Sequence, residues 1–273
     1  MRIGIIWNFW GAKNIFDNWH DGHRAAIEYV GKKHKISWFL ADDYKNAQDT
    51  FDFLLFWNDC SDPIIDYFSQ FKARKGLILT SDNNLNPDNL KKYNVIYCES
   101  EPVKEKVEIY GVRTIKAMGT DSDFFSPDDS KKDIEYFYPA TFSPWKRQSK
   151  IAHLGPKLLC VGTIQPDGQE ELKVCQDKDV NIEIGYFPAK KIRDYYRRAK
   201  QIWIPAIHGS ERTVLEAMSC GILPIVISDN SKALSYINEC FSVGKENNPR
   251  QFILDNYSHK IFGKQLLKGI ENG

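Results

Sequence analysis

The sequence predicts an α/β protein built from two doubly wound, Rossmann-like domains. Short apolar segments with the pattern of buried strands alternate with segments that have helix start and stop signals. The alternation stops once, at Gly119–Lys132, where aspartates, serines and a proline replace it, and then resumes. A chain of 273 residues with 42% hydrophobic content can supply a core for each half.

The first half carries six predicted parallel strands and three predicted helices. The helix signals are Asp21 as N-cap, Gly31 and Gly111 as C-caps, and Pro63 in a first turn. We expect helices at 21–31, 61–71 and 101–110, and a loop at 8–19. Strands are expected at 3–7, 35–40, 51–57, 76–80, 94–98 and 112–118.

The second half repeats this alternation after the linker. Strands are expected at 134–140, 158–162, 180–184, 201–204 and 222–227. Helices are expected at 146–154, 189–199, within 210–220, at 231–238 and at 257–270. The predicted domains are therefore an acceptor-side domain, a linker, a nucleotide-binding domain, and a C-terminal helix that can cross back to the first domain: 1–120, 121–133, 134–255 and 256–273.

Composition excludes several classes of protein. A net charge of +1 argues against nucleic-acid binding. The six cysteines are scattered without a CxxC pair, which favours buried free thiols over disulfides or zinc ligands. No apolar run approaches the ~20 residues of a membrane span, and the apolar segment 1–7 is too short for a signal peptide and is expected to form the first strand. We therefore expect a cytoplasmic protein, with peripheral contact at the inner membrane face left open.

One basic segment bears on that membrane question. Lys72, Arg74 and Lys75 follow Phe68 and Phe71, which is the composition of a membrane-facing patch. The alternative is a solvated helix end, and the sequence favours that alternative.

Residues 208–221 contain the densest chemistry of the chain. Gly209 permits close backbone approach to a ligand, and Ser210 is a natural N-cap for the helix that follows. Glu211 lies in the first turn, where the helix dipole stabilises a carboxylate without any further role. Glu216 lies among apolar residues and could accept two hydrogen bonds from a ribose diol. The alternative for Glu216 is an ion pair with a lysine or arginine.

Two further loops are expected at the same edge of the second sheet, because the carboxyl ends of parallel strands meet there. Lys146 and Arg147 follow the strand at 134–140, at a predicted helix start that favours an anion such as phosphate. They could also be solvated surface cations. Tyr186 and Phe187 follow the strand at 180–184 and could flank a flat base, or could serve ordinary packing.

Several of these segments resemble the retaining glycosyltransferases of the group 1 type (family 4), which have the GT-B fold. The run "VLEAMSCG" at 214–221 is similar to the end of their signature, in which two acidic residues lie eight positions apart. The other similar stretches occur in the family's order: Met1–Ile5, Gly31–Ile36, Gly119–Pro127, Phe142–Lys146 and Gly185–Pro205.

The resemblance implies a metal-independent enzyme without cofactor. It would transfer a sugar from a UDP-, GDP- or ADP-linked donor, with retention, to an unknown acceptor held by the N-terminal half. The implied catalytic residues are Lys146, His208 and Glu216. Lys146 would contact the diphosphate and Glu216 the ribose. The implied donor-binding residues are Thr141, Lys146, Arg147, Tyr186, Phe187, Gly209, Ser210, Glu211, Arg212, Thr213 and Glu216.

The chain departs from the family pattern at several positions. His208 stands where the first acid is expected, and Thr141 stands where a diphosphate-binding arginine is expected. The place of an N-terminal histidine holds Asn58-Asp59-Cys60. The N-terminal glycine pair is missing, with Asp21-Gly22 or Gly11-Ala12 as substitutes.

These departures keep other hypotheses open. One is a non-catalytic module that binds a nucleotide sugar or a glycan, and another is an epimerase of the same fold. Asp121-Ser122-Asp123 has the spacing of a metal-binding DxD motif, but its place in the linker favours a capping or turn role.

Overall fold

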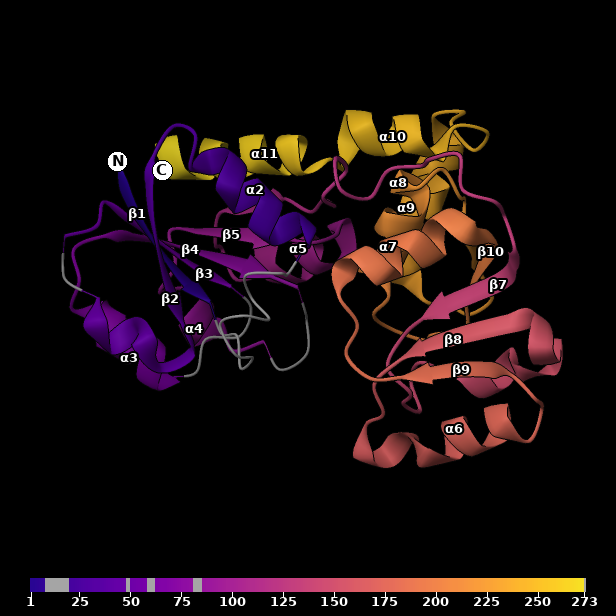
Figure 1. Cartoon of the computed structure of the whole chain (residues 1–273). Helices are drawn as coiled ribbons and strands as arrows, with labels where there is room; N and C mark the ends of the chain where they lie inside the picture. The colour runs from indigo at the N-terminus through magenta and orange to yellow at the C-terminus, as the bar shows by residue number, and fades with distance from the viewer. Residues whose placement is uncertain (8–19, 48–49, 58–61, 81–84, 273) are drawn as a thin grey trace. The chain divides into compact units, whose positions relative to one another are not determined.

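The computed structural model describes residues 1–7, 20–47, 50–57, 62–80 and 85–272. It contains two compact units. Unit 1 comprises Met1–Gly119 and His259–Gly273, and unit 2 comprises Thr120–Ser258. Each unit is built on one parallel sheet, six-stranded in unit 1 and five-stranded in unit 2 (Figure 1). The predicted α/β class, with one parallel sheet in each half of the chain, is confirmed.

The sheet of unit 1 has the strand order β2-β1-β3-β4-β5-β6. All neighbouring strands pair in parallel, for example Ile5 with Trp38 of β2 and with Leu55 of β3. The central strand β3 is apolar along its whole length because both faces of the sheet are covered. The strands are β1 (Arg2–Trp7), β2 (Lys35–Leu40), β3 (Phe53–Trp57), β4 (Arg74–Leu79), β5 (Val95–Cys98) and β6 (Thr114–Lys116).

Helices cover both faces of this sheet. One face packs its apolar residues against α2 (Gly22–Val30) and α11 (His259–Glu271). The other face packs against α3 (Asp62–Ser69) and α5 (Glu101–Glu108). The predicted N-cap of α2 is confirmed, because the Asp21 carboxylate accepts a 2.8 Å hydrogen bond from the Arg24 amide. The shorter η1 (Ala41–Asn46) and α4 (Pro87–Leu90) were not predicted.

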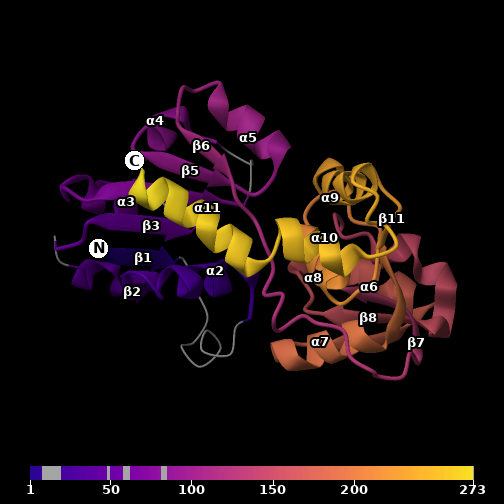
Figure 2. The same cartoon turned by 90° about the horizontal axis from the view of Figure 1, so that it is seen from above.

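The last helix of the chain is part of unit 1. Figure 2 shows α11 beside α2, against which it packs. Gly263 lets the two helices approach, since a Cβ there would lie 2.4 Å from the Tyr29 ring. The Tyr97 hydroxyl of β5 donates a 2.9 Å hydrogen bond to the Leu266 carbonyl. These contacts tie α11 to the first sheet.

The sheet of unit 2 has the strand order β11-β10-β7-β8-β9. The direction of strand addition reverses at β7, since β8 and β9 lie on one side of it and β10 and β11 on the other. The strands are β7 (Ile134–Pro139), β8 (Leu158–Gly162), β9 (Asn181–Ile184), β10 (Ala199–Ile204) and β11 (Ile225–Val226). The helices are α6 (Gln169–Gln176), α7 (Ala189–Arg198), α8 (Glu211–Ser219), α9 (Ser231–Ser242) and α10 (Pro249–Asn256).

One predicted helix is wrong. Residues 146–154 form a turn and the 3₁₀ helices η2 (Gln148–Lys150) and η3 (Ala152–Lys157). Arg147 has φ 54° and Gly155 has φ 58°, so right-handed helical conformation is broken at both positions. Lys146 and Arg147 therefore do not lie at the start of an α-helix. The helices α6 and α10 were not predicted, and β11 is shorter than the predicted strand at 222–227.

The segment 120–132 is held against unit 2 by side chains that bond its backbone. Arg250 donates to the carbonyls of Phe125 at 3.2 Å and Ser219 at 2.6 Å, and Arg197 donates to the Ser126 carbonyl at 2.7 Å. The Asp121 carboxylate accepts a 3.1 Å hydrogen bond from the Phe124 amide, as expected of a turn residue.

The cysteines fit the expectation of buried free thiols wherever they are described. Burial raises the pKa of Cys98 and of Cys220 to about 12, so both remain protonated near neutral pH. Cys60 lies outside the described residues. In the described part of the chain, no helix is long and apolar enough to cross a membrane. The free, buried thiols are Cys98, Cys160, Cys175, Cys220 and Cys240.

Candidate functional site

The loops that the sequence singled out follow the carboxyl ends of three strands in unit 2. Residues 141–147 follow β7, residues 185–188 follow β9, and residues 205–210 follow β10 and lead into α8. In parallel sheets, loops at this edge carry the ligand-binding groups, and the site forms where strand order reverses. The reversal here is at β7.

Lys146 is the centre of this cluster. Its Nζ donates a 3.0 Å hydrogen bond to the Ser210 Oγ at the start of α8. The buried Tyr138 hydroxyl donates to the Lys146 carbonyl at 3.2 Å and lies 3.5 Å from the Ser210 Oγ. The two loops, 64 residues apart in sequence, are thereby joined through one ammonium group.

The environment of Lys146 disfavours an isolated positive charge. Burial lowers the pKa of Lys146 below its ordinary value of 10.5, and the nearby Glu211 carboxylate opposes this shift. A further anion beside the ammonium would stabilise its charged form. The position is therefore suited to a phosphate oxygen.

Gly209 is required by this contact. Its φ of +70° is left-handed, and a Cβ on it would lie 2.7 Å from the Lys146 Nζ. The Gly209 carbonyl accepts a 2.7 Å hydrogen bond from the Asn230 amide, whose oxygen caps α9 by accepting from the Ala233 amide at 3.1 Å. The start of α9 thus fixes the loop that contacts Lys146.

Ser210 occupies the predicted N-cap position of α8, but its side chain does not cap the helix. Its φ of 73° is left-handed, and the hydroxyl instead accepts the Lys146 hydrogen bond. A contact between residues 64 positions apart therefore replaces the local cap expected of a serine at this position.

The loop after β7 is rigidly packed. The Thr141 hydroxyl lies 2.9 Å from the Thr163 hydroxyl, and Gln148 donates to the carbonyls of Ala140 and Thr141 at 3.2 and 2.9 Å. A Cβ on Gly168 would lie 2.1 Å from the Phe142 carbonyl oxygen. Thr141, where the family resemblance expects an arginine, therefore belongs to a hydroxyl pair.

Three buried polar atoms at this site have no hydrogen-bond partner among the described residues. They are the Ser143 Oγ, the Gln148 Oε1 and the Glu211 Oε1. Ser143 and Gln148 are fully buried, and Glu211 is 8% exposed. Unpartnered buried polar atoms are costly in a folded protein and concentrate where a ligand or ordered water binds.

His208 lies at the rim of the cluster rather than inside it. Its exposed imidazole stacks on the Trp145 indole, with ring centroids 5.8 Å apart and planes at 12°. The Ile207 amide donates a 3.0 Å hydrogen bond to the Trp145 carbonyl, which joins the same two loops through the backbone.

Glu216 is engaged within α8. Its Oε1 accepts a 2.5 Å hydrogen bond from the Arg212 Nε, one helical turn earlier. The Glu216 side chain is 5% exposed and the Arg212 side chain 44% exposed. Burial, with the Glu216 charge as the next cause, raises the pKa of the Tyr196 hydroxyl. The ion pair that the sequence left as an alternative is present, and Thr213 is buried in the same turn.

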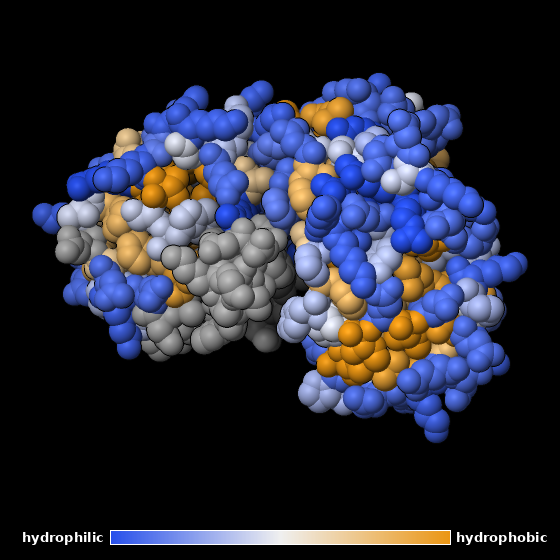
Figure 3. All heavy atoms as spheres, viewed as in Figure 1, coloured by the Kyte–Doolittle hydropathy of each residue, from blue (hydrophilic) through white to orange (hydrophobic). Residues whose placement is uncertain are grey.

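The remaining predicted donor residues differ in exposure. Tyr186 is 84% exposed, whereas Phe187 is half-buried with the Lys191 Nζ 4.3 Å from its ring centroid. In Figure 3 an apolar area lies over β8 and β9, where Ile184 is 49% exposed. Arg147 is half-buried in the turn after Lys146. The loop after β9 therefore offers apolar surface suited to a flat base.

The residues considered as substitutes in unit 1 are only partly described. Asp21 and His23 lie at the start of α2, with the Asp21 Oδ2 4.0 Å from the His23 Nδ1. The His23 ring makes edge contacts with Trp7, Trp57 and Phe262. Asn58-Asp59-Cys60 and Gly11-Ala12 lie outside the described residues.

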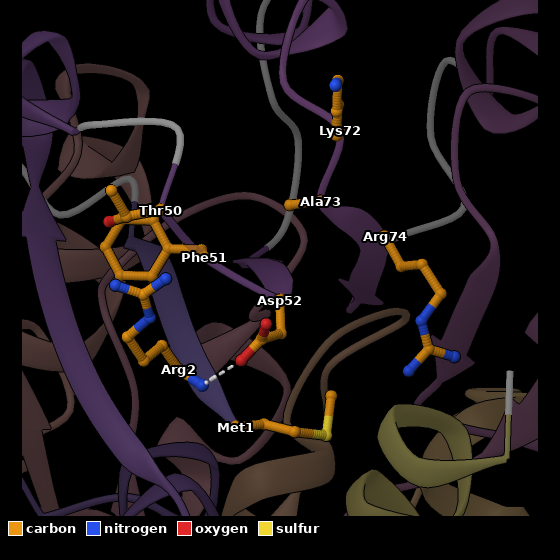
Figure 4. Close-up of a pocket in the computed structure, with 8 residues that line it drawn as sticks. All are labelled: Met1, Arg2, Thr50, Phe51, Asp52, Lys72, Ala73 and Arg74. Atoms are coloured by element: carbon orange, nitrogen blue, oxygen red, sulfur yellow. Dashed lines mark hydrogen bonds between the residues drawn. The ribbon is translucent and has the colours of Figure 1, made fainter.

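Unit 1 also contains a basic hollow of about 660 Å³ at the amino ends of β1, β3 and β4 (Figure 4). The Arg2 amide donates a 2.6 Å hydrogen bond to the Asp52 carboxylate there. Arg74 bonds the Ile270 carbonyl of α11, and Lys75 donates to the carbonyls of Phe71 and Ala73. Arg74 and Lys75 thus bond backbone carbonyls, which favours a structural role over a membrane-facing patch.

Several residues of the site were not predicted from the sequence. Tyr138 and Asn230 hold the two loops, Gln148 and Thr163 fix the first of them, and Trp145 stacks on His208. Only Asn230 had a usable signal, since an asparagine before a predicted helix is a good N-cap. The contacts of Tyr138 and Gln148 span the turn before η2, which was not predicted, and those of Thr163 and Trp145 join residues distant in sequence.

No protein-family model matches this sequence, and no curated protein is similar to it in sequence. Solved structures do share its fold. A glycosyltransferase from Rickettsia africae matches with a TM-score of 0.66 at 14% identity, over 99% of this chain and 98% of that chain. A trehalose-6-phosphate synthase matches with a TM-score of 0.70 at 9% identity, over 100% and 99%.

An epimerase is also among the matches. The UDP-GlcNAc 2-epimerase from Neisseria meningitidis, solved with UDP-GlcNAc, matches with a TM-score of 0.61 at 10% identity, over 100% of both chains. At these identities the matches establish the fold alone. The chain therefore has the GT-B fold that glycosyltransferases and nucleotide-sugar epimerases share.

Proposed function

We propose that this protein is a glycosyltransferase of the group 1 type that uses a nucleoside-diphosphate sugar as donor. The observation that carries the proposal is the half-buried Lys146 ammonium at the carboxyl edge of unit 2, held by Ser210 and closely approached by Gly209. A fixed cation at that edge can stabilise the charge that develops on a leaving diphosphate. The fold shared with nucleotide-sugar enzymes supports the assignment.

The proposed donor site uses three parts of unit 2. Lys146 and the backbone at Gly209 and Ser210 take the diphosphate, while Phe187 and its apolar surroundings take the base. Glu216, oriented by Arg212, takes the ribose diol.

In the reaction, the bond from the anomeric carbon to the diphosphate oxygen breaks with both electrons going to that oxygen. The acceptor oxygen bonds to the same face of the carbon and its proton passes to the departing phosphate.

We propose a reaction without a metal ion, because Lys146 supplies a positive charge where the leaving group forms. The acceptor hydroxyl then needs no base beyond the phosphate itself, which is the arrangement expected of a retaining enzyme. Retention is tested by the anomeric configuration of the product, and metal independence by activity that survives EDTA.

The primary test is transfer from a panel of UDP-, GDP- and ADP-sugars, with Lys146→Met as the site variant. Losing a charge-assisted contact to the diphosphate lowers affinity for the cognate nucleoside diphosphate by about 10- to 100-fold. Lys150→Met is the matched control, because Lys150 is an exposed lysine of the adjacent η2 helix. Lys146→Met with unchanged affinity and activity would remove the site assignment.

An epimerase is the second candidate. Among the matching structures, one is a UDP-GlcNAc 2-epimerase and another is a putative UDP-N-acetylglucosamine 2-epimerase. A third was solved with UDP. The same panel separates the two activities. An epimerase returns the sugar still attached to its nucleotide with one inverted centre, whereas a transferase releases the nucleoside diphosphate. Binding without either product would identify the chain as a non-catalytic nucleotide-sugar module.

A further inference from the structure

The start of α8 contains a carboxylate whose position is unusual for an anion-binding loop. Glu211 is the first residue of this nine-residue helix and is 8% exposed. Its Oε1 is buried and has no hydrogen-bond partner among the described residues. Burying a charged acceptor without a donor is costly, so the folded protein holds Glu211 ready for a donor that the described chain does not supply.

The neighbours of Glu211 connect it to the Lys146 ammonium. Ser210, immediately before it, accepts the hydrogen bond of the Lys146 ammonium at 3.0 Å. The Glu211 charge acts on that same ammonium. Glu211 therefore lies beside the cation that the proposed function assigns to the diphosphate, on a helix end whose own amides favour an anion.

Phosphate cannot be the group that Glu211 accepts from. Phosphate oxygens at neutral pH are acceptors with negative charge, so they repel a carboxylate and offer it no hydrogen. A hydroxyl group is the complementary partner, and the part of a nucleotide sugar next to the diphosphate is the sugar. The fully buried Gln148 also presents an unpartnered acceptor oxygen in this cluster.

We infer that Glu211 is the sugar-recognising acid of this protein, accepting a hydrogen bond from a hydroxyl of the donor's transferred sugar. The inference rests on the proposed function and names a specificity residue within that site. His208 does not take this role, because its ring is exposed and stacked on Trp145. The Glu211 carboxylate favours sugars that have a hydroxyl group within its hydrogen-bonding distance over sugars that lack one.

The test compares the affinity for a nucleoside diphosphate with the affinity for its sugar derivative, both measured by calorimetry. The pairs are UDP and UDP-glucose, GDP and GDP-mannose, and ADP and ADP-glucose. The variant is Glu211→Gln, which keeps the side-chain shape and removes the charge. The control is Glu170→Gln, which removes an exposed acid from the first turn of α6. Both variants lose a favourable helix-dipole charge, but only Glu211 follows the residue that bonds Lys146 and acts on its charge.

We expect Glu211→Gln to lower the affinity for the nucleotide sugar by about 10- to 100-fold relative to its nucleoside diphosphate. Affinity for the nucleoside diphosphate stays the same or rises, since a negative charge beside Lys146 is gone. Glu170→Gln leaves both affinities unchanged. The deciding quantity is the ratio of the nucleotide-sugar affinity to the nucleoside-diphosphate affinity. If Glu211→Gln leaves this ratio unchanged, including by an equal loss of both affinities, the inference is overturned and the proposed function stands.

Two further results complete the test. If the wild-type protein binds none of these nucleotides or nucleotide sugars, the proposed function and the inference both fail. If Glu211→Gln does not fold, Glu211→Asp keeps the charge at the helix start and withdraws the oxygens by one methylene. Glu211→Asp must also lower the nucleotide-sugar affinity relative to the nucleoside-diphosphate affinity. If that ratio equals the wild-type ratio, the inference is overturned.

Discussion

A Cβ atom on Gly209 would lie 2.7 Å from the Lys146 Nζ. The Lys146 ammonium can therefore lie where it does only because residue 209 has no side chain. The contact joins the loop after β7 to the loop after β10. Both loops are further fixed by hydrogen bonds from Tyr138 and Asn230. The Lys146 ammonium is thus held in place before any ligand binds, which is the property an anion site needs.

We predict that Gly209→Ala displaces Lys146 and weakens nucleoside-diphosphate binding by about tenfold or more. The left-handed φ of +70° adds about 1–3 kcal/mol of destabilisation. Gly244→Ala is the matched control, because Gly244 has φ +67° with no described atom within 4 Å of the added Cβ. Equal losses of affinity in the two variants, measured by calorimetry, would show that Lys146 does not depend on Gly209.

Asn230→Ala should affect stability and binding together. It removes the N-cap of α9, which costs about 0.5–2 kcal/mol, and leaves the Gly209 carbonyl without its amide donor. Asn248→Ala removes an equivalent cap from α10, where the side chain accepts from the Gln251 amide. Both variants should melt at lower temperature, and only Asn230→Ala should lose nucleotide affinity. Unaltered affinity in Asn230→Ala would separate α9 from the site.

Much of the fold was predictable because strands and helix caps are local features. The strands β2 and β8 have the predicted bounds, and Asp21 caps α2 as expected. The helix predicted at 146–154 is wrong because Arg147 adopts a left-handed φ of 54°, which interrupts a right-handed helix and which the local pattern does not reveal. The individual residues Lys146, Ser210 and Glu211 were predictable as site candidates. Their mutual contacts were not, because 64 residues separate the first two.

The pH dependence of stability should report the titration of the half-buried Lys146. Its pKa is lower in the folded protein than the ordinary 10.5 expected in the unfolded chain. Between those two values the unfolded chain binds more protons, so the free energy of unfolding rises with pH across that window. Below both pKa values the charged Lys146 lowers the free energy of unfolding by the full amount that the pKa difference represents.

The measurement is urea unfolding of the wild-type protein and of Lys146→Met between pH 7 and pH 11. We expect the wild-type free energy of unfolding to rise toward alkaline pH relative to the variant, since other groups titrate equally in both. A constant difference between the two curves would contradict the lowered pKa. Added nucleoside diphosphate should move the rise to higher pH, because a bound anion favours the charged lysine.

Arg212 holds Glu216 through an ion pair within α8. Arg212→Ala leaves a carboxylate that is 5% exposed without this guanidinium, so we expect a loss of about 1–3 kcal/mol of stability and weaker nucleotide binding. The matched control is Arg198→Ala, which breaks a pair with Asp133 whose side chains are 42% and 40% exposed, and which should cost less than about 1 kcal/mol. Adding Glu216→Gln to Arg212→Ala should recover part of the lost stability but none of the binding, because the ribose still lacks its carboxylate. Recovery of binding in the double variant would mean that Glu216 only balances the charge of Arg212.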